Sequence, residues 1–248
     1  MKKLIILFYP MIIWSQSGMD LAIMIDQKPS PKDLKNHTEM ILTNSKGKSR
    51  TNRMISKSMD KNKKQIIWFL EPKDDRGVSF LKIEHEHKDD EMRMWLPAFK
   101  KVRRISAKKR GDSFMGSDLS FEDLSNRELT HNNYNRLEDE IVGDQDCYVL
   151  ETFPKKEAKS SYSRHVSFID KTTLNILKEF SYDRRGELKK EKDFGYRSIE
   201  GYQILKRVFV KDMTNHHTTE VLFSDIIVDE GIEQNLFHEK NLKRIPRD

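Results

Sequence analysis

Short strand-like runs, most of them with alternating polar and apolar residues, recur along this chain from residue 39 onward, and they limit the folds that it can adopt. Thirteen such runs lie at 39–42, 50–56, 65–70, 78–83, 92–96, 101–105, 137–142, 147–153, 164–169, 174–182, 188–196, 202–210 and 218–228. Turn-forming pairs such as Gly143-Asp144 and Arg185-Gly186 stand between them. A period of two residues is typical of strands, and no helices alternate with the runs as a parallel sheet requires. The sequence therefore predicts a mainly β, antiparallel meander in one domain.

Two local features refine this prediction. The run Gln65–Leu70 (QIIWFL) is apolar on both faces of a strand, so the sheet must be covered on part of its second side. We expect a short helix near Phe121 to be the cover. Apolar residues at helical spacing follow Asp20, which we expect to be the N-cap of a short amphipathic helix that ends before Pro29.

The N-terminus has the pattern of a secretory signal. A basic start, Met1-Lys2-Lys3, precedes eleven apolar residues, 4–14, which are too few to cross a bilayer as a helix. Ser15 and Ser17 occupy the small-residue positions of a cleavage site. We expect residues 1–17 to be a signal peptide and 18–248 to be the mature, soluble domain, although Gln16 is an alternative last residue of the signal. The other interpretation of the apolar run is a short buried strand.

Composition restricts the partners. The only cysteine, Cys147, has no partner for an internal disulfide and is expected to be a small core residue. The formal charge is +6, and removal of Lys2 and Lys3 leaves +4. A basic chain often binds nucleic acid, but an exported chain is expected instead to meet an anionic membrane surface or an acidic protein partner.

Two motifs suggest chemistry only weakly. Gly111-Asp112-Ser113 is similar to the nucleophile box of GDS-type ester hydrolases, but Asp212 and His216 lack the spacing of the remaining catalytic pair. A turn is the alternative interpretation. Glu84-His85-Glu86-His87 places two imidazoles on one strand face without a third protein ligand nearby, so we expect a polar strand end and neither metal nor cofactor.

The segment 95–124 has large apolar residues on both sides of a basic run. It contains Trp95-Leu96-Pro97, Val102-Arg103-Arg104-Ile105, Phe114-Met115-Gly116-Ser117-Asp118 and Glu122-Asp123-Leu124, in that order. This ordered set resembles the LolA-like outer-membrane lipoprotein-sorting proteins. The resemblance extends over nearly the whole mature chain. It implies an open, curved antiparallel β-barrel with short α-helices over a hydrophobic cavity.

The resemblance also implies a function. We expect a monomeric, non-enzymatic periplasmic carrier that binds acyl chains of a lipoprotein or lipid and shuttles them from the inner to the outer membrane. An inner-membrane exporter and an outer-membrane acceptor are the implied partners, and nucleic acid is not. The alternatives are a periplasmic lipid-sensing regulatory binding protein and the ester hydrolase.

Candidate residues follow from these patterns. The residues expected to contact cargo are Trp68, Phe80, Met94, Trp95, Leu96, Phe99, Phe114, Met115, Leu119, Phe121 and Leu124. The residues expected to contact a membrane or partner are Arg103, Arg104, Lys108, Lys109 and Arg110, with a solvated strand and loop as the alternative. Arg50 and Arg53 resemble paired basic residues of the family, but the sequence does not orient them. We expect Phe121 and Leu124 to lie in a mobile cover, on a short helix that Ser120 caps with Asp123 as its partner.

Overall fold

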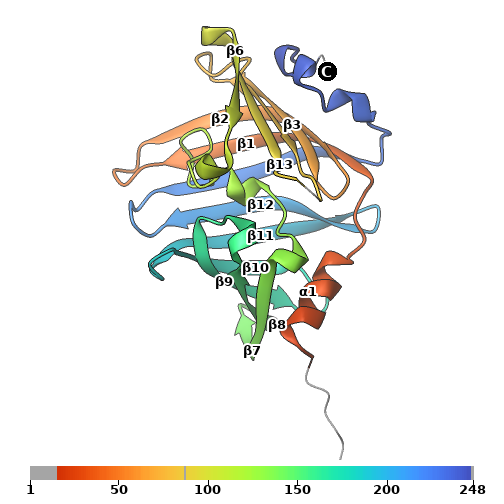
Figure 1. The fold of residues 1–248 in the computed structure, drawn as a ribbon, viewed down its shortest axis with the longest axis vertical. Helices are drawn as coiled ribbons and strands as arrows, with labels where there is room; N and C mark the ends of the chain where they lie inside the picture. The colour runs from red at the N-terminus through yellow and green to blue at the C-terminus, as the bar shows by residue number, and fades with distance from the viewer. Residues whose placement is uncertain (1–15, 87, 247–248) are drawn as a thin grey trace, which may run out of the picture.

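A single antiparallel sheet dominates the computed structural model, which describes residues 16–86 and 88–246 (Figure 1). Its strands are β1 (Asp33–Thr43), β2 (Ser49–Met59), β3 (Lys64–Glu71), β4 (Ser79–Ile83), β5 (Glu91–Leu96), β6 (Lys101–Ile105), β7 (Asn132–Val142), β8 (Gln145–Pro154), β9 (Tyr162–Asp170), β10 (Ile176–Asp183), β11 (Leu188–Ile199), β12 (Tyr202–Asp212) and β13 (Thr218–Val228). The helices are α1 (Gly18–Asp26) and the 3-10 turns η1 (Pro97–Phe99), η2 (Ala107–Lys109), η3 (Glu122–Leu124), η4 (Leu129–His131), η5 (Lys156–Ala158), η6 (Gln234–Leu236) and η7 (Glu239–Lys243). None of these helices has both the length and the apolar character needed to cross a bilayer.

The first six strands run in order from the centre of the sheet to one edge, and the remaining strands run from the other edge back to the centre. The strand order is β6-β5-β4-β3-β2-β1-β13-β12-β11-β10-β9-β8-β7, and every neighbouring pair is antiparallel. The two halves of the chain meet where β1 pairs with β13, with Met40 opposite Val221. β6 and β7 are the edges, and the sheet does not close. The predicted mainly β, open antiparallel fold is therefore confirmed.

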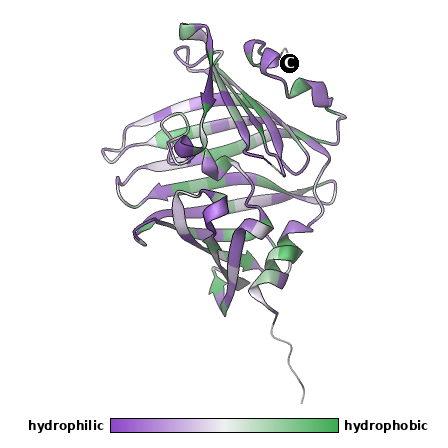
Figure 2. Cartoon of the chain, in the orientation of Figure 1, coloured by the Kyte–Doolittle hydropathy of each residue, from purple (hydrophilic) through white to green (hydrophobic). Residues whose placement is uncertain are grey.

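Residues 106–131 connect the two edges and are called here the crossover segment. They contain η2, η3 and η4 and pass across one face of the sheet, which we call the inner face (Figure 1). Along the strands, apolar and polar residues alternate in bands (Figure 2). This alternation separates an inner from an outer set of side chains.

The run QIIWFL is buried on both faces of β3, as its sequence predicts. Ile67 and Phe69 join the inner core with the aromatic rings of the crossover segment, whereas Trp68 joins an outer cluster with Phe237 and Leu242. The Trp68 indole donates a hydrogen bond to the Asn241 carbonyl at 3.3 Å. Residues 233–243 thus cover part of the outer face, over the β3 to β5 region. The cover expected near Phe121 lies on the inner face, where Phe121 joins the same core as Ile67 and Phe69.

The N-terminal helix is present, with a different cap from the one expected. Ser17 is the N-cap of α1, and Asp20, three residues later, completes a capping box with it. Gly18 lies so close to β7 that an added Cβ would be 2.8 Å from the Tyr134 carbonyl carbon. The small residue therefore lets α1 pack tightly against β7 and β8, where Leu21 contacts the core beside Leu150.

Cys147 is a buried core residue, as expected. It is 0% exposed and packs in a cluster with Val149 and Phe168. Burial raises the pKa of its thiol, which keeps the thiol protonated and unreactive.

Candidate functional site

A cavity of about 1180 Å³ lies between the inner face of the sheet, the crossover segment and the end of α1. Its walls include side chains from β1, β2 and β3 on one side and from β8 to β13 on the other. The inner face of the sheet forms the floor, and the crossover segment covers part of it. The two sides of the cavity differ in chemistry.

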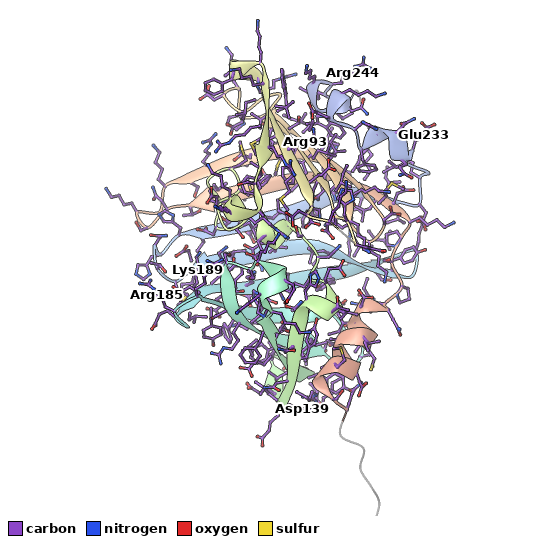
Figure 3. The ribbon with its side chains drawn as sticks, viewed as in Figure 1. Arg93, Asp139, Arg185, Lys189, Glu233 and Arg244 are labelled. Atoms are coloured by element: carbon purple, nitrogen blue, oxygen red, sulfur yellow. The ribbon has the colours of Figure 1, made fainter. Side chains whose placement is uncertain are left out.

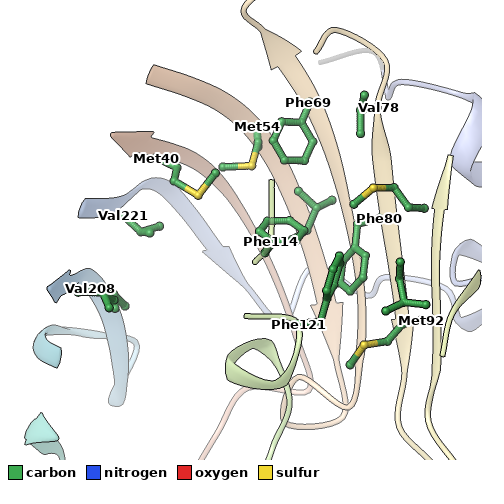
Figure 4. Close-up of a cluster of buried hydrophobic side chains, with 14 residues drawn as sticks. Met40, Met54, Phe69, Val78, Phe80, Met92, Phe114, Phe121, Val208 and Val221 are labelled. Carbon is green, nitrogen blue, oxygen red and sulfur yellow. The ribbon is translucent and has the colours of Figure 1, made fainter. Parts of the chain in front are cut away.

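The side formed by β1 to β6 contains a methionine-rich apolar wall beside polar side chains such as Asn36, Ser56 and Gln65. Its lining residues include Met40, Met54, Ile67, Met92 and Ile105. Beside them, aromatic rings of the crossover segment pack against rings of the sheet (Figure 4). The Phe114 and Phe80 centroids are 5.4 Å apart, and those of Phe114 and Phe121 are 5.7 Å apart. Thioether side chains adapt to irregular apolar shapes, so this wall suits a flexible hydrocarbon.

The side formed by β9 to β11 contains a buried ionic network. The Asp123 carboxylate of the crossover segment accepts hydrogen bonds from the Lys190 ammonium at 2.7 Å and the Lys192 ammonium at 2.6 Å. Glu179 on β10 is bound by both terminal nitrogens of Arg127 at 2.7 and 2.8 Å, and by Lys192 at 3.2 Å. Bidentate geometry makes the Arg127–Glu179 pair the strongest type of protein ion pair.

Charge pairing outweighs burial at both carboxylates. Burial alone raises the pKa of Asp123, but Lys192 and Lys190 hold it well below its usual value. Burial likewise opposes ionisation of Glu179, yet Arg127 and Lys192 hold its pKa well below the usual value. Both groups are therefore ionised at neutral pH.

His165 lies beside this network as a neutral group. Burial, and then the positive charge of Arg127, lower the pKa of His165 well below its usual value. Its Nδ1 atom is 2.9 Å from the Ser181 hydroxyl and 3.3 Å from an Arg127 nitrogen. The network with His165 neutral contains three cations, on Arg127, Lys190 and Lys192, and two carboxylates.

The crossover segment is attached to both sides of the cavity. The helix expected near Phe121 is a single 3-10 turn, η3, and Ser120 and Asp123 exchange the hydrogen bonds expected of a capping pair, at 2.8 and 3.2 Å. Phe121 packs on the apolar side, and Asp123 binds the ionic side. At the end of η3, the Leu124 carbonyl accepts a hydrogen bond from the ammonium of the fully buried Lys82 at 2.6 Å.

The structure separates the expected cargo residues into four groups. Those on the cavity wall are Phe114, Leu119 and Leu124. Those in or against the same inner core, without lining the cavity, are Phe80, Met94, Leu96, Met115 and Phe121. Those in the outer cluster, under residues 233–243, are Trp68 and Trp95. Phe99 stands apart in η1, where it is 70% exposed.

The basic residues lie mostly on the outside. Arg103, Arg104, Lys108 and Lys109 are exposed, whereas Arg110 is an ion-pair partner of Asp90 at 3.2 Å. Other charged side chains, such as Arg185, Lys189 and Asp139, also lie at the periphery (Figure 3).

Arg50 and Arg53, which the sequence left unoriented, do not line the cavity. Arg50 forms an ion pair with Asp75, and Arg53 binds Glu71 at 2.9 Å.

The weak chemical motifs have structural explanations. The Ser113 hydroxyl donates to the Ser117 carbonyl at 2.6 Å, and Ser113 pairs with Ser120 in an isolated β-bridge, which supports the turn interpretation. Glu84 binds the buried Lys82 and the Asn126 side chain. His87 lies outside the described residues, and within 16–86 and 88–246 no group of His, Cys, Asp and Glu has the arrangement of a metal site.

Sequence reasoning missed the ionic side of the cavity. Lys190 and Lys192 alternate with Glu191 and Asp193, which is the usual pattern of a solvated strand. A signal was nevertheless present, because His165 and Ser167, Glu179 and Ser181, and Lys190 and Lys192 place polar residues at alternating positions of three successive strands.

Comparison with known proteins gives consistent relatives. A family model described only as like an uncharacterized protein matches residues 61–244. Residues of this chain align with a solved domain assigned to outer-membrane lipoprotein sorting in Vibrio parahaemolyticus, at 33% identity and a TM-score of 0.86, covering 92% of this chain and 98% of that one. A DUF1329 family protein from Desulfovibrio piger is 31% identical with a TM-score of 0.86, over 91% and 97% of the two chains.

A more distant structure shares the fold alone. A LolA superfamily protein from Nitrosomonas europaea is 16% identical with a TM-score of 0.72, and the alignment covers 91% of this chain and 99% of that one. No curated protein matches the sequence.

Proposed function

The chain belongs to the LolA-like family of outer-membrane lipoprotein-sorting proteins, and from this we propose that it is a periplasmic carrier of acyl chains. The cargo is a lipoprotein or a lipid, which the carrier shuttles from the inner to the outer membrane. An inner-membrane exporter gives up the cargo, and an outer-membrane acceptor receives it. The carrier changes no covalent bond in this cycle.

The cavity is the observation that carries this proposal. Its volume of about 1180 Å³ is above the range of roughly 300–1,000 Å³ that is typical of small-ligand sites. The methionine-rich wall of Met40, Met54 and Met92 offers an adaptable apolar surface. A large, partly apolar space of this kind is suited to hydrocarbon chains.

Release requires that the cargo be held incompletely. Burying one methylene group contributes about 0.8 kcal/mol, so a single sixteen-carbon chain contributes on the order of 12 kcal/mol. Three fully buried chains would exceed the practical limit of roughly 20 kcal/mol for non-covalent binding. The polar side of the cavity lowers the total affinity, which favours transfer to an acceptor that binds more tightly.

The crossover segment is the proposed movable cover of the cavity. It contributes Phe114, Leu119 and Leu124 to the wall, and Asp123 fastens it to β11. A disulfide engineered between this segment and β11, in a Cys147→Ser background, is expected to trap loaded protein and block transfer. Transfer at an unchanged rate in the oxidised protein would exclude movement of this segment.

Exposed basic residues provide the proposed contact with the membranes or their proteins. Arg103, Arg104, Lys108 and Lys109 lie on or just after the edge strand β6, where headgroups or acidic side chains can reach them. Each basic residue near an anionic membrane contributes about 1 kcal/mol. Four together are sufficient for reversible attachment.

The test is direct identification of the cargo. The protein is purified from its periplasm without detergent, and organic extracts are analysed by mass spectrometry. We expect acyl lipids in the native protein and a severalfold loss in Phe223→Asp, because a carboxylate on the cavity wall is costly to desolvate. Ile227→Asp is the matched control, since Ile227 lies on the same strand but is 43% exposed and away from the cavity.

Two outcomes would overturn the carrier function. Absence of acyl lipid from the native extract, together with no binding of added acyl ligands, would reject it. So would equal lipid content in the two β13 variants, with thermal unfolding showing that both are folded.

A further inference from the structure

Lys28 is an unneutralised cation on the cavity wall. It follows α1, is half-buried, and donates hydrogen bonds to the Leu174 carbonyl at 3.1 Å and to the Asn175 side-chain oxygen. Both acceptors are neutral. Among the described residues, no carboxylate is within ion-pairing distance of the Lys28 ammonium, which has three donors.

The carboxylate that acts on Lys28 through space, that of Asp170, already accepts hydrogen bonds within its own turn. Burial lowers the pKa of Lys28, and Asp170 opposes this effect through space. The Asp170 carboxylate, however, accepts hydrogen bonds from the backbone of Thr172 at 2.8 Å and Thr173 at 2.6 Å, which close its own turn. Asp26, also on the wall, is 3.8 Å from Lys61. The charge on Lys28 therefore faces the cavity without a direct counterion.

A second polar group stands beside Lys28. The ammonium lies 5.7 Å from the centre of the Tyr196 ring, and Tyr196 also lines the cavity. In the described part of the chain the Tyr196 hydroxyl makes no hydrogen bond with protein. Burial raises its pKa, so the hydroxyl remains a neutral donor at physiological pH.

The floor between this pair and the apolar wall is continuous. Phe194 lies on the same strand as Tyr196, and Phe194 and Leu205 line the cavity and pack against the inner core. Lys192, further along β11, belongs to the network with three cations and two carboxylates. A chain that starts at Lys28 can thus run over the apolar side chains of Phe194 and Leu205 toward Met54.

We propose that the cargo is an anionic amphiphile, with its carboxylate or phosphate bound by Lys28 and the Tyr196 hydroxyl and its hydrocarbon chain lying against the methionine-rich wall. This inference rests on the proposed carrier function and names the chemical class of its cargo. Lys28 supplies the charge, Tyr196 supplies a directed hydrogen bond, and the anion neutralises a cation that is costly to leave unpaired in a partly buried site.

Calorimetric titration of the delipidated protein tests the proposal. The probes share a twelve-carbon chain and differ at one end: dodecanoic acid, dodecyl phosphate and methyl dodecanoate. A charge-assisted hydrogen bond is worth roughly tenfold or more in affinity, so we expect at least one anion to bind about tenfold more tightly than the ester. Comparison of the two anions identifies which headgroup the site prefers.

Variants assign the preference to this site. Lys28→Met is expected to bring the best anion within about twofold of the ester, Lys28→Arg to keep most of the preference, and Tyr196→Phe to reduce it about threefold. Lys61→Met is the matched control, because Lys61 lines the cavity too but is already beside Asp26. Unfolding curves and ester affinity show whether each variant is folded.

The outcomes separate the inference from the carrier function. Equal affinity for anions and ester in the unaltered protein, or an unchanged preference in Lys28→Met, would overturn the anionic cargo but leave acyl binding intact. Failure of all three probes to bind would overturn the carrier function itself.

Discussion

The two sides of the inner face hold the same crossover segment by different forces. On the β1 to β6 side, Phe114 and Phe121 pack among rings and methionines, which is a contact proportional to buried area. On the β9 to β11 side, Asp123 and Arg127 form ion pairs with Lys190, Lys192 and Glu179, whose side chains are only 3–4% exposed. Apolar packing tolerates small displacements, whereas a buried charge that loses its partner is left at high cost. The ionic side is therefore the better candidate for a two-state latch, and the apolar side for a compliant cargo surface.

The largest effect is expected from breaking the ionic side. Asp123→Ala leaves Lys190 and Lys192 buried without their shared carboxylate, and we expect the free energy of unfolding to fall by about 3–5 kcal/mol. Urea denaturation measures it. Lys192 still pairs with Glu179, so the double variant Asp123→Ala with Lys190→Met removes the charge that is left without a carboxylate and is expected to recover part of the loss. If Asp123→Ala lowers the free energy of unfolding by less than about 1 kcal/mol, the ion pairs contribute little to stability.

A smaller effect is expected on the apolar side. Phe121→Leu keeps an apolar side chain in the ring cluster but removes its contacts with Phe80 and Phe114, and we expect a loss of about 1–2 kcal/mol. The same denaturation experiment applies. Equal losses for Phe121→Leu and Asp123→Ala would contradict the contrast between the two sides.

Acid is expected to weaken the ionic side before the apolar side. The folded pKa of His165 lies below its unfolded value of about 6.5, so its contribution is complete above that pH and is lost as pH falls toward the folded pKa. The slope is up to about 1.4 kcal/mol per pH unit. Asp123 and Glu179, whose folded pKa values are also depressed, add a further loss as pH falls below about 4.

Replacement of His165 isolates its part of this pH dependence. His165→Gln keeps a side chain that can accept a hydrogen bond but removes the titration. Denaturation curves between pH 7 and 5 are expected to show a shallower decline in this variant than in the unaltered protein. Identical slopes would mean that His165 has the same pKa in both states.

The smallest effect concerns the outer face, which serves as a reference for both sides. Trp68 and Trp95 lie under residues 233–243, away from the cavity, so acyl ligands are expected to leave the emission of these two tryptophans nearly unchanged. Phe237→Ala, which opens the outer cluster, is expected to shift the emission to longer wavelength. A large ligand-induced shift would place cargo on the outer face.

Much of the fold follows from local sequence alone. Each of the strand-like runs overlaps one strand of the described residues, 16–86 and 88–246, because a period of two is a property of the extended backbone itself. Boundaries were less certain: β7 begins at Asn132, five residues before the alternation becomes clear. Cys147 was expected in the core and lies there, since a small apolar residue within an apolar run has few other environments.

The candidate site was predictable only in part. Phe114, Leu119 and Leu124 were expected near cargo, because the crossover segment contains too many small and polar residues for a strand. All three line the cavity. Trp68 and Trp95 were grouped with them, Trp95 because it lies in the motif Trp95-Leu96-Pro97, but both lie in the outer cluster. Alternation shows that residues two apart share a face of the sheet, but it does not say which face is inner.

The sequence by itself determined the strands, their antiparallel class and the family motifs of segment 95–124, since these depend on neighbours along the chain. Tertiary structure alone decided that β1 meets β13, that residues 233–243 cover Trp68, and that Asp123 meets Lys190 and Lys192. Each of these contacts joins distant parts of the chain. Their partners are selected by the burial of complementary surfaces when the sheet curves, and no local period carries that information.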